Sequence, residues 1–244
     1  MLFSKKELIK SLLDGAVDMH NHVLPGIDDG ASDIKTSIDL IKKYKALGYS
    51  KIIATPHTMS DYYPNTATTI LETLDKLNLE IKNQNIDGIE LKAASEYMID
   101  PDFEEMINSE SQLLTYKNNH ILIEMSYLRE SANFNEVIFK LQLKNYKPIL
   151  AHPERYSFYL DDFDKYYAIK KLGVKLQLNM LALTEHYGSK IQKTAKRLLK
   201  EGMYDYIGID THRMDHLEKV DTIKISKKRI EDIKHLLENN KSLF

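Results

Sequence analysis

Seven short apolar segments recur along this chain, and most are followed by a segment whose apolar residues have helical spacing. The segments expected to form strands are residues 16–20, 51–54, 89–94, 121–123, 148–151, 174–178 and 206–209. Alternation of strand and helix is typical of α/β proteins, in which right-handed crossovers join parallel strands. The sequence therefore predicts an α/β fold whose parallel strands form a barrel.

Six of the seven segments end in side chains that can bind metal ions or transfer protons. These side chains are His20 and His22, His57, Glu96, Glu124, His152, and Asp210 and His212. In a parallel α/β barrel, the residues just past the carboxyl ends of the strands converge on one mouth, where catalysis takes place. Scattered core histidines and surface carboxylates would not line up in this way. We therefore expect one polar cluster at the mouth.

The first of these motifs has the layout of a metal site. His20 and His22 are two residues apart on an extended chain, so their side chains point to the same side. A glycine turn rich in carboxylates follows at residues 27–30 and adds Asp29. The cluster then has nine candidate ligands, which is more than one ion needs and suits two or three ions.

The chain contains no cysteine. Its absence excludes disulfides, thiolate metal sites and cysteine nucleophiles. A ligand set of imidazoles and carboxylates suits manganese, iron or zinc and disfavours copper(I). Such ions can lower the pKa of a bound water and neutralise a phosphate group, as metal-assisted phosphoryl transfer requires.

Arg155 is the candidate for phosphate binding. It follows His152 by three residues, and its planar, permanently charged guanidinium suits bidentate contact with phosphate. Three divalent ions, four carboxylates and this arginine would leave a positive charge that a phosphate dianion and a hydroxide neutralise. The alternative is an ordinary surface arginine that pairs with Glu154.

Length and charge limit the domain organisation and the partners. A chain of 244 residues suits one barrel-sized domain or two small ones, and a formal net charge of −2 gives no general reason to expect nucleic acid or an anionic membrane as partner. No apolar run has membrane-spanning length and no signal-peptide core is present, so we expect a cytoplasmic protein without membrane insertion. A capping pattern at residues 4–7 predicts a helical extension over residues 1–15, ahead of a barrel over residues 16–244.

The motifs at residues 18–30, 54–57, 95–97, 122–124, 151–155 and 210–212 resemble those of the bacterial PHP-type (polymerase and histidinol phosphatase) metal-dependent protein-tyrosine phosphatases of capsule and exopolysaccharide operons. The likeness runs from about Ala16 to His212, which is most of the chain. It implies a distorted seven-stranded barrel, the PHP domain, with two or three metal ions that are usually assigned as manganese. Iron, cobalt and zinc are the alternatives. It also implies hydrolysis of phosphotyrosine on a protein, such as the tyrosine-rich tail of a bacterial tyrosine kinase.

The resemblance also implies a division of the ligands. The first ion would be held by His20, His22, Glu96 and Asp210, the second by Glu96, Glu124 and His152, and the third by Asp29, His57 and His212, with Arg155 on the phosphate. The chain departs from many relatives at Thr58, where they have a second histidine, and at Ile209 and Thr211, where they have Ser and Ala. Neither departure removes a ligand.

Three other functions remain open from the sequence. A small-molecule phosphomonoesterase such as a histidinol-phosphate phosphatase would share the metals. An amidohydrolase would share the His-x-His motif, but such enzymes commonly carry a bridging lysine at a strand end, and Glu124 stands at the end of the fourth strand here. A regulatory barrel without activity is disfavoured because no candidate ligand has been lost.

Leaving-group chemistry favours phosphotyrosine among the phosphate esters. A tyrosine phenol has a pKa of about 10 and leaves far more easily than an alkoxide. The five strand-end histidines are all candidate ligands, which leaves none to protonate a poor leaving group. The other four histidines, interpreted as ordinary surface or helix residues, are His120, His186, His216 and His235. Tyrosines that could stack on an aromatic substrate are Tyr62, Tyr63, Tyr156 and Tyr159.

Overall fold

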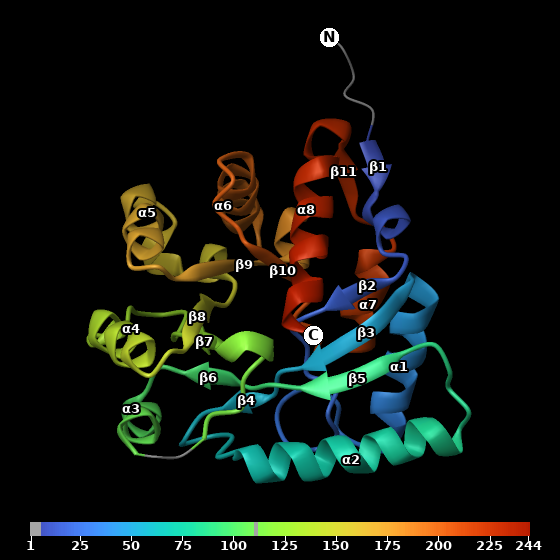
Figure 1. Ribbon diagram of the computed structural model, residues 1–244. Coiled ribbons are helices and arrows are strands. Elements are labelled where there is room, and N and C mark those ends of the chain that lie inside the picture. Colours follow the sequence, from blue (N-terminus) through green and yellow to red (C-terminus); the bar gives the residue numbers. More distant parts are fainter. Residues whose placement is uncertain (1–5, 110–111) are drawn as a thin grey trace.

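A curled sheet of six parallel strands forms the larger part of the fold. The computed structural model describes residues 6–109 and 112–244. The strands of this sheet are β4 (His57–Thr58), β6 (Glu96–Met98), β7 (His120–Glu124), β8 (Lys147–Leu150), β9 (Lys175–Asn179) and β10 (Tyr206–Gly208), in the order β10-β9-β8-β7-β6-β4. Together they make a half-barrel whose helices lie on its outer side (Figure 1).

A second parallel sheet completes the barrel-like core. It contains β2 (Ala16–Asp18), β3 (Tyr49–Ala54) and β5 (Glu90–Ala93), in the order β2-β3-β5. Two of the expected strands pass from this sheet into the larger one, because β3 continues into β4 after Thr55 and Pro56, and β5 continues into β6 after residues 94–95. Proline has no N–H to donate to a ladder. The expected α/β class is confirmed, but the count of seven strands in one barrel is not, since the parallel strands are divided between two sheets.

Contacts between β2 and β10 hold the two sheets together. On the mouth side, Asn21 and Thr211 form a parallel bridge, and the N–H of Asp210 donates to the carbonyl of His20 at 2.8 Å. On the other side, helix α8 (Ile230–Asn240) packs on both strands. The buried Asn240 amide donates to the carbonyls of residues 17 and 207 at 2.9 and 2.6 Å. One side chain therefore bridges strands of different sheets.

Helices cover both sheets. The helices beside the smaller sheet are α1 (Ile34–Leu47) and α2 (Ala67–Asn83), and those outside the larger one are α3 (Pro101–Asn108), α4 (Phe134–Leu143), α5 (Phe163–Lys171) and α6 (Ser189–Lys200) (Figure 1). Helix α7 (Met214–Val220) follows β10. The short 3₁₀-helices are η1 (Ile9–Leu12), η2 (Lys117–Asn119), η3 (Pro153–Arg155), η4 (Ser157–Tyr159), η5 (Met180–Leu183), η6 (Lys227–Arg229) and η7 (Lys241–Leu243). No described helix combines the length and apolar character of a membrane span.

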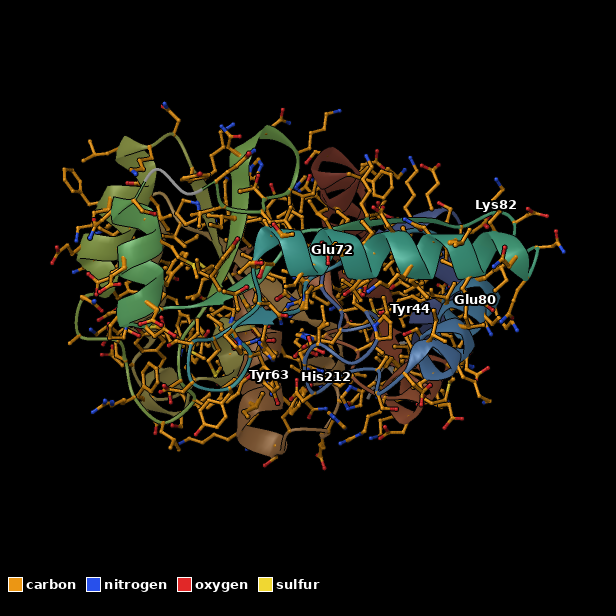
Figure 2. All side chains as sticks on the ribbon, turned by 90° about the horizontal axis from the view of Figure 1, so that it is seen from below. Tyr44, Tyr63, Glu72, Glu80, Lys82 and His212 are labelled. Carbon is orange, nitrogen blue, oxygen red and sulfur yellow. The ribbon has the colours of Figure 1, made fainter. Side chains whose placement is uncertain are left out.

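Capping and burial explain where these helices begin and which side faces the core. The Asp33 carboxylate, one residue beyond Ser32, accepts from the N–H of Thr36 and starts α1. The helix ends at Gly48, whose φ of 105° suits glycine. Helix α2 buries one apolar side, and its charged side, which carries Glu72, faces solvent (Figure 2). Burial of that apolar side gives the helix a stability that its local propensity alone would not.

The amino-terminal segment differs from the helix expected there. Residues 1–5, with most of the capping pattern, lie outside the described residues. Residues Lys6–Leu8 form β1, which pairs antiparallel with β11 (Lys224–Ser226), and the short helix η1 follows. Ile9 and Leu13 are fully buried. The backbone partner in β11 and this burial explain why a strand forms in place of the first helical turn.

The interior of the half-barrel is apolar toward the amino ends of its strands and polar at their carboxyl ends. Because side chains alternate along a strand, Leu122 and Glu124 of β7 point to the same inner side. Leu122 belongs to a buried cluster at the floor, and Phe244 packs against that cluster near the carboxyl terminus. Ile121 and Ile123 point the other way and pack in the core under the helices. The fold therefore places Glu124 one pleat above an apolar floor.

Candidate metal centre

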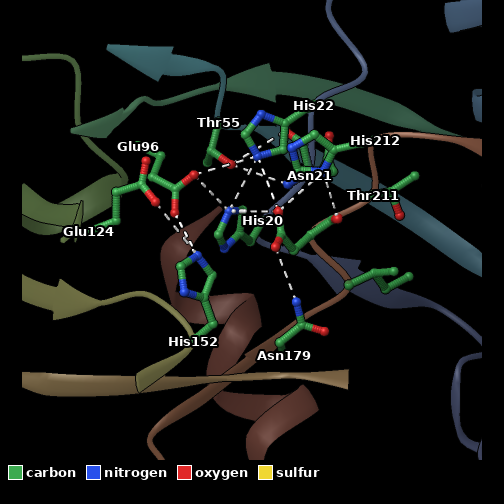
Figure 3. Close-up of polar contacts among 12 residues, drawn as sticks. His20, Asn21, His22, Thr55, Glu96, Glu124, His152, Asn179, Thr211 and His212 are labelled. Atoms are coloured by element: carbon green, nitrogen blue, oxygen red, sulfur yellow. Dashed lines mark hydrogen bonds and ion pairs between the residues drawn. The ribbon is translucent and has the colours of Figure 1, made fainter. Parts of the chain in front are cut away.

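The first histidine pair meets two carboxylates inside the mouth. His20 Nε2 lies 3.2 Å from Glu96 Oε2 and 3.4 Å from Asp210 Oδ1. His22 Nε2 lies 3.5 and 3.3 Å from the same two oxygens. All four side chains are buried, and Figure 3 shows the two histidines beside Glu96. The four residues expected to hold one ion are thus brought together.

The second expected group shares Glu96. His152 Nε2 lies 3.1 Å from Glu96 Oε1 and 3.9 Å from Glu124 Oε2. His57 also faces these carboxylates, with its Nδ1 2.9 Å from Glu124 Oε1 and 3.2 Å from Glu96 Oε2. Glu96 therefore lies between His57 of β4 and the histidines that follow β2 and β8, where one carboxylate could serve more than one ion.

The third expected group lies nearest to solvent. Asp29 Oδ1 is 3.4 Å from both His57 Nε2 and His212 Nε2. The His22 ring stacks on His212 at 4.0 Å between centroids. His22 and His57 each belong to two of the groups that could hold an ion. The structure therefore does not assign either histidine to one ion alone, whereas the resemblance implied one ion for each. The four groups able to hold an ion are His22, Asp29, His57 and His212; His20, His152 and Asp210; His20, His22 and Glu96; and His57, Glu96 and Glu124.

Among the described residues, several polar atoms of this cluster make no hydrogen bond and lie only against other candidate ligands. They are His57 Nδ1, Glu96 Oε2, Glu124 Oε1 and Asp210 Oδ1, and each is buried. A buried polar atom without a partner is costly. These atoms face one another across gaps of about one cation, since metal–ligand bonds to imidazole and carboxylate are about 2.0–2.2 Å long. The residues therefore fit a group of bound metal ions.

Three outer contacts turn the histidines toward the cluster. His20 Nδ1 lies 3.0 Å from Gln177 Oε1, and His22 Nδ1 lies 2.8 Å from Asp28 Oδ2. His212 Nδ1 lies 3.0 Å from the Asp210 carbonyl. When Nδ1–H donates to an oxygen, Nε2 keeps its lone pair for a metal. Sequence reasoning missed Gln177 and Asp28; the available signals were an amide at an inward strand position and a second aspartate in the glycine turn.

The field in the cluster is strongly negative. Burial lowers the pKa of His20, but the Glu96 and Asp210 carboxylates outweigh it and raise that pKa to about 9. Burial would raise the pKa of Glu96, yet His20, His152 and His57 hold it well below its usual range. A site that holds protons on buried imidazoles attracts cations for the same reason.

Two glycines make room for the first histidine pair. A Cβ at Gly30 would lie 2.4 Å from the His22 Cβ, and a Cβ at Gly208 would lie 2.6 Å from the His20 Cβ. Two ligand-bearing residues also have left-handed backbone, with φ of 33° at His152 and 58° at Asp210. Such backbone is uncommon outside glycine and is often found at functional sites.

Arg155 points into the mouth. Its Nη1 donates to Asp210 Oδ2 at 2.5 Å, and its guanidinium carbon lies 4.5 Å from the Tyr127 ring and 4.3 Å from the Tyr187 ring. Glu154, the partner in the alternative interpretation, is buried elsewhere and accepts from the N–H of Asn179. The interpretation of Arg155 as a surface residue paired with Glu154 is therefore wrong.

The mouth opens into a cavity of about 630 Å³. The expected site residues among its lining are Asp29, His57, Tyr62, Tyr63, Glu124, Arg155 and His212. The Tyr63 ring is parallel to His57 at 5.7 Å, and Tyr62 is 74% exposed. In Figure 2, Tyr63 and His212 lie near each other at this opening. Two aromatic side chains therefore stand at the rim, where an aromatic ring would enter.

Two other expectations need correction. Tyr156 and Tyr159 are buried, and their hydroxyls bond to the N–H of Met125 and to Glu130, so they do not face a substrate. His216 lies on helix α7, in agreement with the expected surface or helix position, and its side chain is buried beside His212. The tyrosines that contact Arg155 are instead Tyr127 and Tyr187, which sit in irregular segments that carry no periodic signal.

Comparisons with known proteins agree with this geometry. A family model described as "Capsular polysaccharide synthesis, CpsB/CapC" matches residues 16–241. Tyrosine-protein phosphatase YwqE of Bacillus subtilis is 27% identical over 81% of this chain and 78% of YwqE. CapC of Staphylococcus aureus is 27% identical over 92% of this chain and 89% of CapC.

Solved structures show the same fold. A structure from work on YwqE of B. subtilis and CpsB of Streptococcus pneumoniae, described as metal-dependent tyrosine phosphatases, superposes with a TM-score of 0.81 and 26% identity over 93% of both chains. A histidinol phosphate phosphatase from Lactococcus lactis shares the fold alone, at a TM-score of 0.52 and 16% identity over 85% of this chain and 92% of that one. The resemblance noted in the sequence is confirmed, and the chain belongs to the CpsB/CapC family of capsular polysaccharide synthesis.

Proposed function

We propose that this chain is a metal-dependent phosphatase that hydrolyses phosphotyrosine on proteins. The observation that carries the proposal is the convergence of nine imidazole and carboxylate side chains on one mouth, with the Arg155 guanidinium at its edge. The similarity to YwqE, a named tyrosine-protein phosphatase, supports it.

The ligands would be the nine residues expected from the sequence, in the three sets named there. Manganese suits a cluster of imidazoles and carboxylates without thiolates, and iron, cobalt or zinc would fit the same donors. Two or three bound ions would supply Lewis acidity toward the phosphate and a nucleophile from water at neutral pH.

Arg155 would orient the phosphate group. It contacts Asp210 and lies between the Tyr127 and Tyr187 rings, so its plane is fixed before substrate arrives. Fixed donors stabilise developing charge better than mobile ones, because they need no reorganisation during the reaction. Tyr62 and Tyr63 at the rim would contact the phenyl ring of the substrate.

The charge of the cluster supports a phosphate substrate. Its four carboxylates, Asp29, Glu96, Glu124 and Asp210, would be outweighed by two or three divalent ions together with Arg155. A phosphate dianion would then enter a site of opposite charge. Glu96, Glu124 and Asp210 are buried, where electrostatic interactions are stronger than in water, whereas Asp29 is exposed at the rim.

The histidine positions favour an aryl over an alkyl phosphate. The five histidines expected as ligands all lie in the cluster, and His216 is not among the residues that line the mouth cavity. No imidazole is then left beside the substrate to protonate an alkoxide. A phenolate needs less help, because its conjugate acid has a pKa of about 10.

The second candidate function is a small-molecule phosphomonoesterase such as a histidinol-phosphate phosphatase. It would use the same metals on the same fold. The mouth favours a protein substrate over a small molecule. Tyr62 at its rim is exposed, so a peptide chain could contact this side chain while its phosphotyrosine enters the cavity. A flexible tail of a bacterial tyrosine kinase, in the cytoplasm, is the partner we propose.

The test compares kcat/KM for a phosphotyrosyl peptide, the matching phosphoseryl peptide and histidinol phosphate, at the same metal and pH. We expect the phosphotyrosyl peptide to be preferred by at least about tenfold, as a good leaving group would give. Preference for either alkyl phosphate would leave the small-molecule phosphatase as the better assignment.

We also propose that the two parallel sheets act as one distorted seven-stranded barrel, the PHP domain, over residues 16–244, with residues 1–15 as an extension. The backbone bridge between Asn21 and Thr211 supports this, because it joins the first and last strands at the mouth.

A further inference from the structure

A second groove adjoins the mouth cavity. It has a volume of about 580 Å³ and lies between the start of α3 and the segment after β7. Met98, Asp100 and Ser126 line both hollows. The two hollows therefore adjoin each other, with these three residues at their common border.

The acidic side chains of this groove already have partners. The Asp100 carboxylate accepts from the N–H and hydroxyl of Ser60 at 3.3 and 3.0 Å, and from the N–H of Phe103 at 2.8 Å. The Glu130 carboxylate accepts from the Tyr159 hydroxyl at 2.8 Å and pairs with Lys165 at 3.2 Å. Both carboxylates are therefore held in place by neighbouring donors, and Arg129 is not among them.

Arg129 is the charged group of the groove without a partner. It lines the groove and is exposed, and within residues 6–109 and 112–244 it makes no hydrogen bond or ion pair. An exposed arginine is common at protein surfaces. What distinguishes Arg129 is therefore its place in the groove and not its exposure. Arg129 lies beside the mouth cavity, and its guanidinium has no carboxylate partner among the described residues.

Exposed apolar side chains flank this path. Leu128, beside Arg129, is 86% exposed, and Tyr62 on the facing loop is 74% exposed. A single exposed apolar side chain is ordinary, but these two line the cavity that holds the metal centre. An extended peptide that leaves the mouth would pass Leu128 before it reaches Arg129.

We propose that the groove binds the peptide segment that flanks the phosphotyrosine, with an aspartate or glutamate side chain of that segment on Arg129. This inference rests on the proposed function and adds a specificity determinant to it. The occupant is a flexible acidic peptide, because the groove adjoins the mouth and the guanidinium of Arg129 has no carboxylate partner among the described residues. A solvent-exposed ion pair of this kind changes kcat/KM by about 1.5- to fivefold.

The test measures kcat/KM for two phosphotyrosyl peptides that differ only in flanking residues, acidic in one and lysine in the other, and for free phosphotyrosine. Arg129→Ala should lower kcat/KM for the acidic peptide about 1.5- to fivefold, through KM, and leave kcat/KM for free phosphotyrosine unchanged. Arg129→Glu should reverse the preference between the peptides. Arg229→Ala is the matched control, because it removes the same charge at η6, away from both hollows. It should change kcat/KM for neither peptide.

Two results would overturn the inference. One is an Arg129→Ala protein whose kcat/KM for the acidic peptide, divided by its kcat/KM for the lysine peptide, equals the value for the unchanged protein. The other is an equal loss on free phosphotyrosine, which would assign Arg129 to the fold or the chemistry. Failure of the proposed function is a separate result, because it would appear as absent turnover of free phosphotyrosine by the unchanged protein.

Discussion

At the scale of single residues, Arg155 connects the metal cluster to the mouth. Its guanidinium bonds to Asp210 and lies between the rings of Tyr127 and Tyr187. Arg155→Ala should lower kcat by about a hundredfold or more, because an oriented charged donor to the phosphate is lost. Arg155→Lys should recover only part of this, since lysine lacks the planar fork. Both variants should keep their metal content by elemental analysis, and near-normal kcat for Arg155→Ala would contradict its assigned role.

Gln177 is a positioning residue on the inner side of β9. Its Oε1 accepts from His20 Nδ1 at 3.0 Å and from the N–H of His152 at 3.1 Å. Gln177→Leu should weaken metal binding by about 10- to 100-fold, because both histidines lose the contact that orients them. Titration with the metal, followed by calorimetry, measures this change. Gln84→Leu, at an exposed position after α2, is the control and should bind metal normally; equal affinity in both variants would exclude the positioning role.

The sequence was informative at this scale where strand ends were involved. The nine candidate ligands could be expected to meet because the carboxyl ends of parallel strands share one edge, and the structure brings them together. Gln177 could not be singled out, since an inward amide on a strand looks like any buried polar residue. Tyr127 and Tyr187 lie in irregular segments, where neither periodicity nor spacing indicates a contact with Arg155.

At the scale of elements, Asn240 of α8 closes the seam between β2 and β10. Its amide serves the carbonyls of Val17 and Ile207, and its Oδ1 accepts from the N–H of Ile207 at 3.2 Å. Asn240→Leu should lower the free energy of unfolding by about 1–3 kcal/mol, because buried backbone groups lose their partners. Urea denaturation measures the change. Asn83→Leu, at the exposed end of α2, should change it by less than about 0.5 kcal/mol. Equal effects of the two would show that the seam does not depend on this side chain.

Two elements show where local patterns are insufficient. The capping pattern before residue 8 favours a helix, but Lys6–Leu8 pair with β11, a partner far along the chain that local spacing cannot reveal. The second expected strand is interrupted between β3 and β4. Pro56 indicates this interruption in the sequence, because proline has no N–H to donate to a neighbouring strand. The break after Ala93 had none, because Ala94 and Ser95 fit a strand as well as a turn.

At the scale of the whole molecule, metal binding should stabilise the fold. The buried cluster draws on both parallel sheets, so ions bound there would bind the native chain and not the unfolded one. At a free metal concentration about a thousandfold above Kd, the gain is about 4 kcal/mol. Chelation should therefore lower the midpoint of thermal unfolding by about 10 °C, measured by scanning calorimetry. An unchanged midpoint after verified metal removal would contradict coupling between the cluster and the fold.

Turnover by this protein should depend on the metal cluster as a whole. The direct measurement is turnover of a phosphotyrosyl peptide by metal-free protein as manganese is added, with the bound metal per chain determined in parallel. We expect no turnover without metal, full turnover at two or three ions per chain, and no effect of iodoacetamide, because the chain has no cysteine. Full turnover by protein that elemental analysis finds free of metal would contradict the account.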